Sequence, residues 1–170
     1  MDRILDKARG AQNALERIAN MIPGFSGYRE RELRRTADGL QREYLASHLE
    51  EAKKPLNELA AGASRSGALD LINDIEASRK KLDKVAAEIR FAERGYSGFF
   101  DAVKVDDQTL DKVYAFDLGL LQSVDQILAL AQDAAKAPSN LKASLQALAS
   151  GIDALDLKLG ERVTLLRAIQ

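Results

Sequence analysis

The amino-acid sequence predicts an all-α fold, an antiparallel bundle of four to five long helices. Proline occurs only at Pro23, Pro55 and Pro138, and the intervening segments are rich in Ala, Leu, Glu, Lys, Arg and Gln, the strong helix formers. In addition, no run alternates apolar and polar residues for long enough to form a strand. Amphipathic helices joined by short connections bury their apolar faces against one another, which favours an antiparallel bundle.

The first half of the chain predicts two helices. The first is expected at about 2–21, where apolar residues recur at helical spacing until Pro23 ends the helix. The second begins near Tyr28 and continues to a glycine-flanked turn at 62–67. Pro55 lies inside this second helix and lacks an amide hydrogen, so we expect it to kink the helix or to split it in two.

The second half of the chain predicts three more helices, at about 68–94, 106–136 and 139–170. Asp106 is expected to cap the middle one and Ser139 the last one. The last helix carries Leu and Ile at four-three spacing, which is typical of a coiled-coil seam, and this spacing breaks at 162/163. The seam can pack inside the chain or pair with a second copy, so a homodimer is one expectation. No linker divides the chain, and we expect a single domain, 1–170.

Composition excludes several classes of function. The chain has 170 residues with 25 Lys and Arg against 26 Asp and Glu, so its net charge of −1 gives no general attraction to nucleic acid or anionic lipid. It has no cysteine and one histidine, which excludes disulfide scaffolds, thiol catalysis and Cys-ligated zinc. Motifs for di-iron, calcium, phosphate or dinucleotide sites are missing as well, so we expect neither a metal ion nor a cofactor.

The sequence predicts a cytoplasmic location. The N-terminal segment has charges scattered among its apolar residues, whereas a secretory signal needs an uninterrupted apolar stretch. The longest apolar-rich stretch, around 127–131, is far shorter than a membrane-spanning helix requires.

Two loops share the pattern Gly-aromatic-Ser-Gly-aromatic, at 24–28 and at 95–99. In an up-and-down bundle both loops lie at the same end, which we call the loop pole. The two loops carry five of the nine aromatic residues: Phe25, Tyr28, Tyr96, Phe99 and Phe100. One interpretation is that these rings fold inward and plug the end of the bundle; the other is that they stay exposed and bind a protein partner or a membrane surface.

Asp117 is the second unusual feature, because it stands in a stripe of apolar residues on the predicted helix at 106–136. Burial of an unpaired carboxylate is costly, so a cation should lie nearby. We expect Arg34 or Arg35 to pair with Asp117, with a tyrosine hydroxyl from Tyr28 or Tyr114 in addition. The alternative is that Asp117 lies at the edge of the stripe and reaches water.

Three segments carry a family resemblance: IPGFSGYRERELRR at 22–35, GYSGFFDAVKV at 95–105 and LDKVYAFD at 110–117. With these motifs the chain resembles a family of small bacterial all-helical proteins, over about residues 18–126. The resemblance implies a bacterial cytoplasmic chain with the two-loop layout, and it brings no activity and no catalytic residue.

The sequence therefore favours a non-enzymatic helical-bundle adaptor or assembly component that binds a protein partner through the loop pole. One alternative is a peripheral membrane-associated scaffold or stress protein whose loop rings rest in the membrane interface. Another is a small-ligand binder or an enzyme that uses Asp117, Arg34 and Arg35 around a polar pocket.

Overall fold

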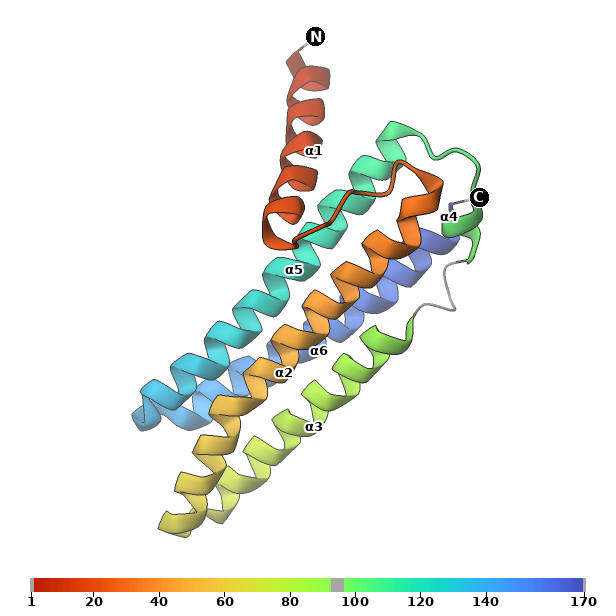
Figure 1. Ribbon diagram of the computed structural model, residues 1–170. Coiled ribbons are helices and arrows are strands. Elements are labelled where there is room, and N and C mark those ends of the chain that lie inside the picture. The colour runs from red at the N-terminus through yellow and green to blue at the C-terminus, as the bar shows by residue number, and fades with distance from the viewer. Residues whose placement is uncertain (1, 93–96, 170) are drawn as a thin grey trace.

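The computed structural model describes residues 2–92 and 97–169 (Figure 1). This part of the chain is helical and contains no strand, so the prediction of an all-α protein is confirmed. The helices are α1 (Asp2–Met21), α2 (Arg34–Ser66), α3 (Leu69–Phe91), α4 (Ser97–Asp101), α5 (Asp107–Lys136) and α6 (Leu141–Arg167). Two short 3-10 turns, Arg31–Leu33 and Pro138–Asn140, precede α2 and α6.

Four long helices run side by side along one axis. The helices α2 and α3 form one hairpin and α5 and α6 a second, with α2 against α5 and α3 against α6 (Figure 1). The helix α1 packs against α5, and the short α4 lies against α6 at the loop pole. The core is made by the facing sides of these helices.

The central helix is α5. Its buried residues include Leu120, Leu121, Val124 and Ile127, and it packs against α1, α2 and α6. Within the described residues α5 is also the one helix that is long and apolar enough to cross a membrane, judged by length and composition alone. A core helix covered by neighbours on several sides has the same composition, because nearly all of its faces must be apolar.

The helix ends test the local predictions. Asp106 caps α5 as expected, because its Oδ1 accepts the amide hydrogen of Thr109 at 2.8 Å. The prediction for Ser139 is wrong, since a 3-10 turn precedes α6 and Asn140 takes the cap position without a side-chain bond. Pro55 lies inside α2, which continues unbroken from Arg34 to Ser66, so the proline does not split the helix.

The leucine seam of α6 packs inside the chain. Its central side chains, Leu148, Ile152 and Leu155, are buried in the same core as α5. These side chains are therefore not available to pair with a second copy, and any self-association must use another surface.

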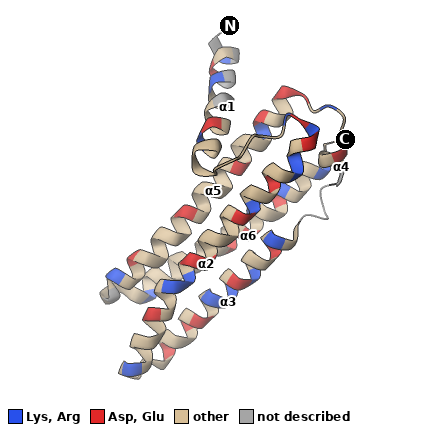
Figure 2. Cartoon of the chain, viewed as in Figure 1, with Lys and Arg blue, Asp and Glu red and all other residues tan. Residues whose placement is uncertain are grey.

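Charged residues bind α3 to its neighbours at the surface. Lys81 pairs with Asp153 of α6 at 2.6 Å, and Lys84 pairs with Asp156 of α6 at 3.1 Å. In the view of Figure 2, residues of both signs are interspersed along the helices, in keeping with a net charge of −1. Exposed pairs of this kind stabilise a fold only weakly, so the position of α3 depends mainly on its apolar face.

Candidate functional site

The two glycine-aromatic loops meet, and their described rings are buried. The exposed fractions are 6% for Phe25, 0% for Tyr28, 0% for Phe99 and 2% for Phe100. Tyr28 lies at the centre, with ring centroids 5.5 Å from Phe25 and 5.3 Å from Phe99 in edge-to-face contacts. These four rings form a plug, as the first interpretation predicts, and none of the four is exposed to a partner. Tyr96 lies outside the described residues.

Glycine is required in the first loop for a steric reason. Gly27 has a φ of +88°, a left-handed conformation that side chains disfavour. A Cβ atom at this position would lie 2.7 Å from the Tyr114 hydroxyl oxygen. That hydroxyl accepts the amide hydrogen of Tyr28 at 2.7 Å, so the absence of a side chain at Gly27 lets Tyr114 hold the loop.

The prediction that Arg34 pairs with Asp117 is wrong. The Arg34 guanidinium is buried and donates hydrogen bonds to backbone carbonyls: Tyr28 O at 2.7 Å, Phe99 O at 3.1 Å and Ala102 O at 2.6 Å. Burial lowers the pKa of Arg34, and the nearby charge of Arg31 lowers it further. Arg34 begins α2 at the level of the loops, where its bonds to the carbonyls of Tyr28, Phe99 and Ala102 tie the first loop to α4.

The prediction for Arg35 is also wrong. Its side chain is exposed, pairs with Asp101 at 3.3 Å and lies over the Phe100 ring, 4.7 Å from the ring centroid. Arg35 therefore covers the outer side of the plug. The cation–π contact and the ion pair both join α2 to α4.

Asp117 is completely buried, as the apolar stripe around it suggested, and its cation is Arg162 of α6. The Arg162 guanidinium donates from Nε to Asp117 Oδ1 at 2.7 Å and from Nη2 to Oδ2 at 3.1 Å. The hydroxyl of Tyr28 donates to Oδ2 at 2.6 Å. The expected tyrosine partner is therefore Tyr28, and the alternative of an edge position open to water is wrong.

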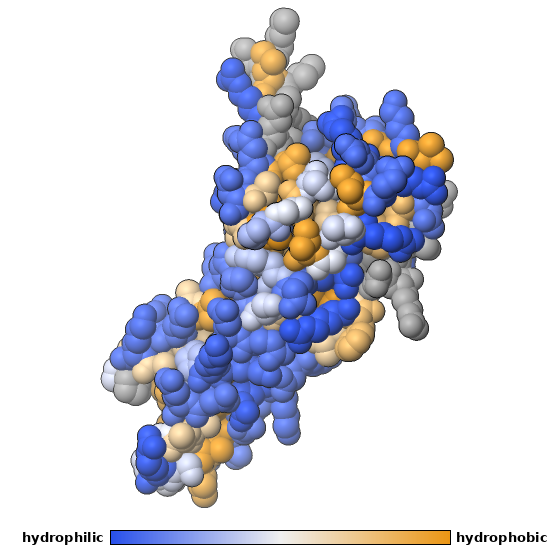
Figure 3. Space-filling model, viewed as in Figure 1, coloured by the Kyte–Doolittle hydropathy of each residue, from blue (hydrophilic) through white to orange (hydrophobic). Residues whose placement is uncertain are grey.

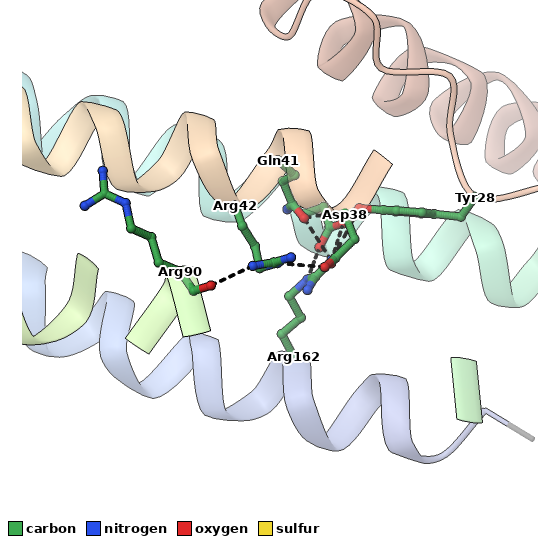
Figure 4. Close-up of polar contacts among 7 residues, drawn as sticks. Tyr28, Asp38, Gln41, Arg42, Arg90 and Arg162 are labelled. Carbon is green, nitrogen blue, oxygen red and sulfur yellow. Dashed lines mark hydrogen bonds and ion pairs between the residues drawn. The ribbon is translucent and has the colours of Figure 1, made fainter. Parts of the chain in front are cut away.

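These residues belong to a larger group, the polar hub, which we define as Tyr28, Asp38, Gln41, Asp117 and Arg162. Arg162 Nη2 also lies 2.8 Å from Gln41 Oε1 and 2.9 Å from Asp38 Oδ1. Figure 4 shows Arg162 reaching from α6 toward Asp38 and Gln41 of α2, with Tyr28 entering from the first loop. One guanidinium thus joins α2, α5, α6 and the loop.

A further arginine connects the polar hub to α3. Arg42 donates from Nε to Asp38 Oδ2 at 2.8 Å and from Nη1 to the carbonyl of Arg90 at 2.9 Å (Figure 4). Arg90 is in the last turn of α3. All four long helices are therefore linked through side chains that meet at one level of the axis.

The polar hub is closed to solvent. Arg162 is 2% exposed, and the other four members are fully buried. Burial alone would lower the pKa of Arg162, but the negative charge of Asp117, with that of Asp38, raises it well above the ordinary value. Burial, then the charge of Asp117, raises the pKa of Tyr28 well above the ordinary value. Near neutral pH the guanidinium is charged and the phenol neutral, so the hub holds helices together and cannot admit a substrate in this conformation.

The open surfaces lie at the opposite end from the loop pole. There the tips of the α2–α3 and α5–α6 hairpins separate, and we call this end the fork (Figure 1). One groove of about 360 Å³ is lined mainly by Leu59, Gly62, Ala63, Leu71, Ala135 and Leu141. A second, of about 440 Å³, lies between α3 and α6 and is more polar, with Asp70, Asp74, Lys81 and Lys142 among its lining residues.

Apolar side chains are exposed near these grooves. Leu69, at the start of α3, is 71% exposed, and Figure 3 shows hydrophobic atoms over the tip of the α2–α3 hairpin. Leucines in a groove whose walls include glycine and alanine are typical of a site for an apolar helix face.

No protein-family model, no curated protein and no solved structure matches this chain. The functional argument therefore rests on the residues and their geometry.

Proposed function

We propose that this protein is a non-enzymatic helical adaptor or assembly component that binds a protein partner. The observation that carries the proposal is the contrast between the closed polar hub and the open fork. The ionisable side chains of the polar hub bond to one another and, through Arg42, to α3, so they join four helices and are not exposed. The accessible apolar surface lies instead in the groove at the fork.

The proposal includes the finer architecture, an antiparallel bundle of α2, α3, α5 and α6 with α2 bent at Pro55. Proline removes one hydrogen bond of the helix and its ring crowds the preceding turn, which bends a helix without ending it. The groove begins at Glu58, three residues after this proline. A bend at Pro55 carries the end of α2 away from α5 and α6, and so supplies a reason for the fork.

The loop pole has a different role in this proposal from the one that the sequence suggested. A membrane scaffold would need exposed rings there, but Phe25, Tyr28, Phe99 and Phe100 are buried. We therefore assign the plug to stability and the fork to binding.

A cross-linked pull-down from cell lysate, membranes included, tests this function. The comparison uses the wild type, a fork variant with Leu69→Ser and Leu71→Ser, and the control Leu157→Ser, which removes another exposed leucine (68% exposed) on α6. We expect one defined protein to be captured by the wild type and the control and lost with the fork variant. Equal capture by all three would overturn the assignment of binding to the fork.

A further inference from the structure

Two helices carry regular apolar seams that are interrupted by one polar residue each. The seam of α5 has three-four spacing, and its polar residue is Asp117: Leu110, Val113, Asp117, Leu120, Val124, Ile127, Ala131 and Ala134. The seam of α6 and the residues after it has the same spacing, and its polar residue is Arg162: Leu141, Leu145, Leu148, Ile152, Leu155, Leu159, Arg162, Leu166 and Ile169. The two interruptions meet as the Asp117–Arg162 pair. A single polar position in an apolar heptad seam specifies register at a cost in stability.

The apolar parts of these seams are compatible with more than one register. A shift by seven residues, about 10 Å along a helix axis, brings apolar residues to the positions of other apolar residues. After such a shift, Val124 and Leu155 would stand at the level that Asp117 and Arg162 occupy now. Packing of the seams alone therefore does not select the observed register.

The alignment that needs selection is the one between the two hairpins. Within each hairpin a short turn sets the register, because 67–68 join α2 to α3 and 137–140 join α5 to α6. The connection from α3 to α5, residues 92–106, is longer and leaves more freedom.

Arg162 crosses from one hairpin to the other inside the core. Asp117 holds the guanidinium within the α5–α6 hairpin by two bonds. On α2, Arg162 Nη2 lies 2.8 Å from Gln41 Oε1 and 2.9 Å from Asp38 Oδ1, and we call these two contacts the Arg162 bridge. A shift of the α5–α6 hairpin by seven residues toward the fork would move Arg162 to the level of Leu45 and away from both partners. Separation of a buried charge from its polar partners is costly, so the bridge disfavours the shifted register.

Other polar contacts between the hairpins lie nearer the surface. Lys81 pairs with Asp153 and Lys84 with Asp156, and these lysine side chains are 39% and 62% exposed. Exposed pairs contribute little free energy, because water screens them. They therefore penalise a shifted register less than the buried bridge does.

The polar hub is an expensive way to fill a core. Asp38, Asp117 and Arg162 are buried charges, and Gln41 Nε2 is buried without a hydrogen-bond partner among the described residues. Replacement of a buried ion pair by apolar side chains is often neutral or stabilising, whereas removal of one partner is strongly destabilising. The hub therefore points to a role in specifying one structure.

We propose that the Arg162 bridge is a register determinant, which selects one alignment of the α5–α6 hairpin against the α2–α3 hairpin at a cost in stability. The inference rests on the proposed bundle and deepens the proposed function. Each wall of the groove of about 360 Å³ at the fork belongs to one hairpin: Leu59 and Leu71 to the first, Ala135 and Leu141 to the second. A shift would separate these walls, so the bridge sets the shape of a groove at the other end of the axis.

A distance between spin labels on the two hairpins tests the register. The chain has no cysteine, so Ser64→Cys on α2 and Ala154→Cys on α6 can each carry one label, and both positions are exposed. Pulsed electron paramagnetic resonance then gives the distribution of distances between the labels. We expect one narrow distance when the bridge is intact.

The double substitution Asp117→Val with Arg162→Met removes the bridge. The Tyr28 hydroxyl keeps its bond to Gln41, and Asp38 keeps its bond to Arg42. We expect a folded protein in which the label distances spread over about 10 Å, the length of a seven-residue shift. The control, Lys81→Met with Lys84→Met, removes the exposed pairs and should keep the narrow wild-type distance.

Urea unfolding measures the cost of the hub. We expect the double variant to be at least as stable as the wild type and Arg162→Met alone to be much less stable. A narrow wild-type distance in the double variant would assign the register to the plug and overturn the proposal. Equal instability of the double variant and Arg162→Met would overturn it too, because the hub would then supply stability.

A second variant covers the case in which the double variant does not fold. It adds three changes that remove the remaining polar groups of the hub: Tyr28→Phe, Asp38→Ala and Gln41→Leu. We expect this variant to fold with a broad distance distribution, and failure of both variants to fold would reject the register role. The distances are measured without a partner, so they are independent of the pull-down that tests the adaptor function.

Discussion

Arg162 and Asp117 form a two-point contact, in which two nitrogens of the guanidinium lie 2.7 and 3.1 Å from the two oxygens of the carboxylate. The same guanidinium also contacts Asp38 and Gln41, so it neutralises charge from two different helices. Bidentate pairs of this kind are strong and directional. The contacts of Arg162 therefore fix how α2, α5 and α6 are aligned along the bundle axis.

Removal of the central cation should be strongly destabilising. Arg162→Met leaves Asp117 and Asp38 buried beside an apolar side chain, and we expect a loss of about 3–5 kcal/mol in the free energy of unfolding. Urea titration followed by circular dichroism measures this loss. Lys142→Met, an exposed change on the same helix, is the control and should leave stability close to that of the wild type. Equal stability of the two variants would show that Arg162 does not hold the hub.

The free energy of unfolding should fall at alkaline pH, because Tyr28 and Tyr44 have raised pKa values in the folded protein. Burial, followed by the charge of Asp125, raises the pKa of Tyr44 to about 12, and the pKa of Tyr28 is raised well above its ordinary value. The folded protein therefore keeps protons that the unfolded chain releases near pH 10. The resulting stabilisation is complete below about pH 10 and is lost as the pH rises through the folded pKa values, by about 1.4 kcal/mol per pH unit for each tyrosine.

Unfolding free energies between pH 8 and pH 11.5 check this dependence. Tyr28→Phe should lower stability at pH 8, because Asp117 loses a hydrogen bond, but its stability should fall less steeply above pH 10. Tyr44→Phe should also reduce the alkaline slope. A wild-type stability that stays constant from pH 9 to pH 11 contradicts the proposed role of both hydroxyls.

Two glycine substitutions should change stability in opposite directions. Gly27→Ala forces a Cβ into a left-handed residue and toward the Tyr114 hydroxyl, so we expect a loss of more than about 1 kcal/mol. Gly62→Ala places a Cβ in open space inside α2 and should gain about 0.5–1 kcal/mol. Melting temperatures of the two variants measure the contrast, and a destabilised Gly62→Ala or a neutral Gly27→Ala would count against this geometry.

Arg34→Met should release α4 from the loop pole. The substitution removes the guanidinium that donates hydrogen bonds to the carbonyls of Phe99 and Ala102. Both carbonyls therefore lose these bonds. Hydrogen exchange should therefore become faster in the segment 98–105, while α5 and α6 keep their protection. Arg35→Met provides the comparison, since its exposed contacts with Asp101 and Phe100 lie on the outer side of the plug. Uniformly faster exchange across all helices would instead indicate general destabilisation.

Some features could be predicted from the sequence because they depend on neighbouring residues. The place of Asp106 before an amphipathic segment predicts it as a cap, and the apolar residues at helical spacing around Asp117 make its burial one of two alternatives, of which the structure shows the buried one. The expected positions of the helices follow the same local periodicity. The predicted start of the second helix near Tyr28 is wrong, since Arg31–Leu33 form a 3-10 turn and α2 begins at Arg34. Charged residues there favour a helix, but the bond from Arg34 to the carbonyl of Tyr28 holds the segment in the loop.

The partner of Asp117 could not be found by local reasoning. Arg162 lies 45 residues further along the chain, and its signal is the break in the leucine spacing of the last helix. Extending the buried stripe of α2 backward from Leu45 reaches Gln41 and Asp38, which is the corresponding signal on that helix. The bonds of Arg34 are harder to foresee, because backbone carbonyls such as Phe99 O acquire their positions only when the two loops have met.

The position of Arg162 in the chain also bears on how the protein is made. Synthesis proceeds from the N-terminus, so Gln41 leaves the ribosome 121 residues before the guanidinium that binds it. Asp117 precedes that guanidinium by 45 residues, a delay on the order of a few seconds at about 5–20 residues per second. During this interval Asp38 already has Arg42 beside it, but Asp117 lacks the guanidinium that pairs with it in the folded protein. The interior therefore closes only when α6 arrives, and translation of the last helix sets the moment at which folding can finish.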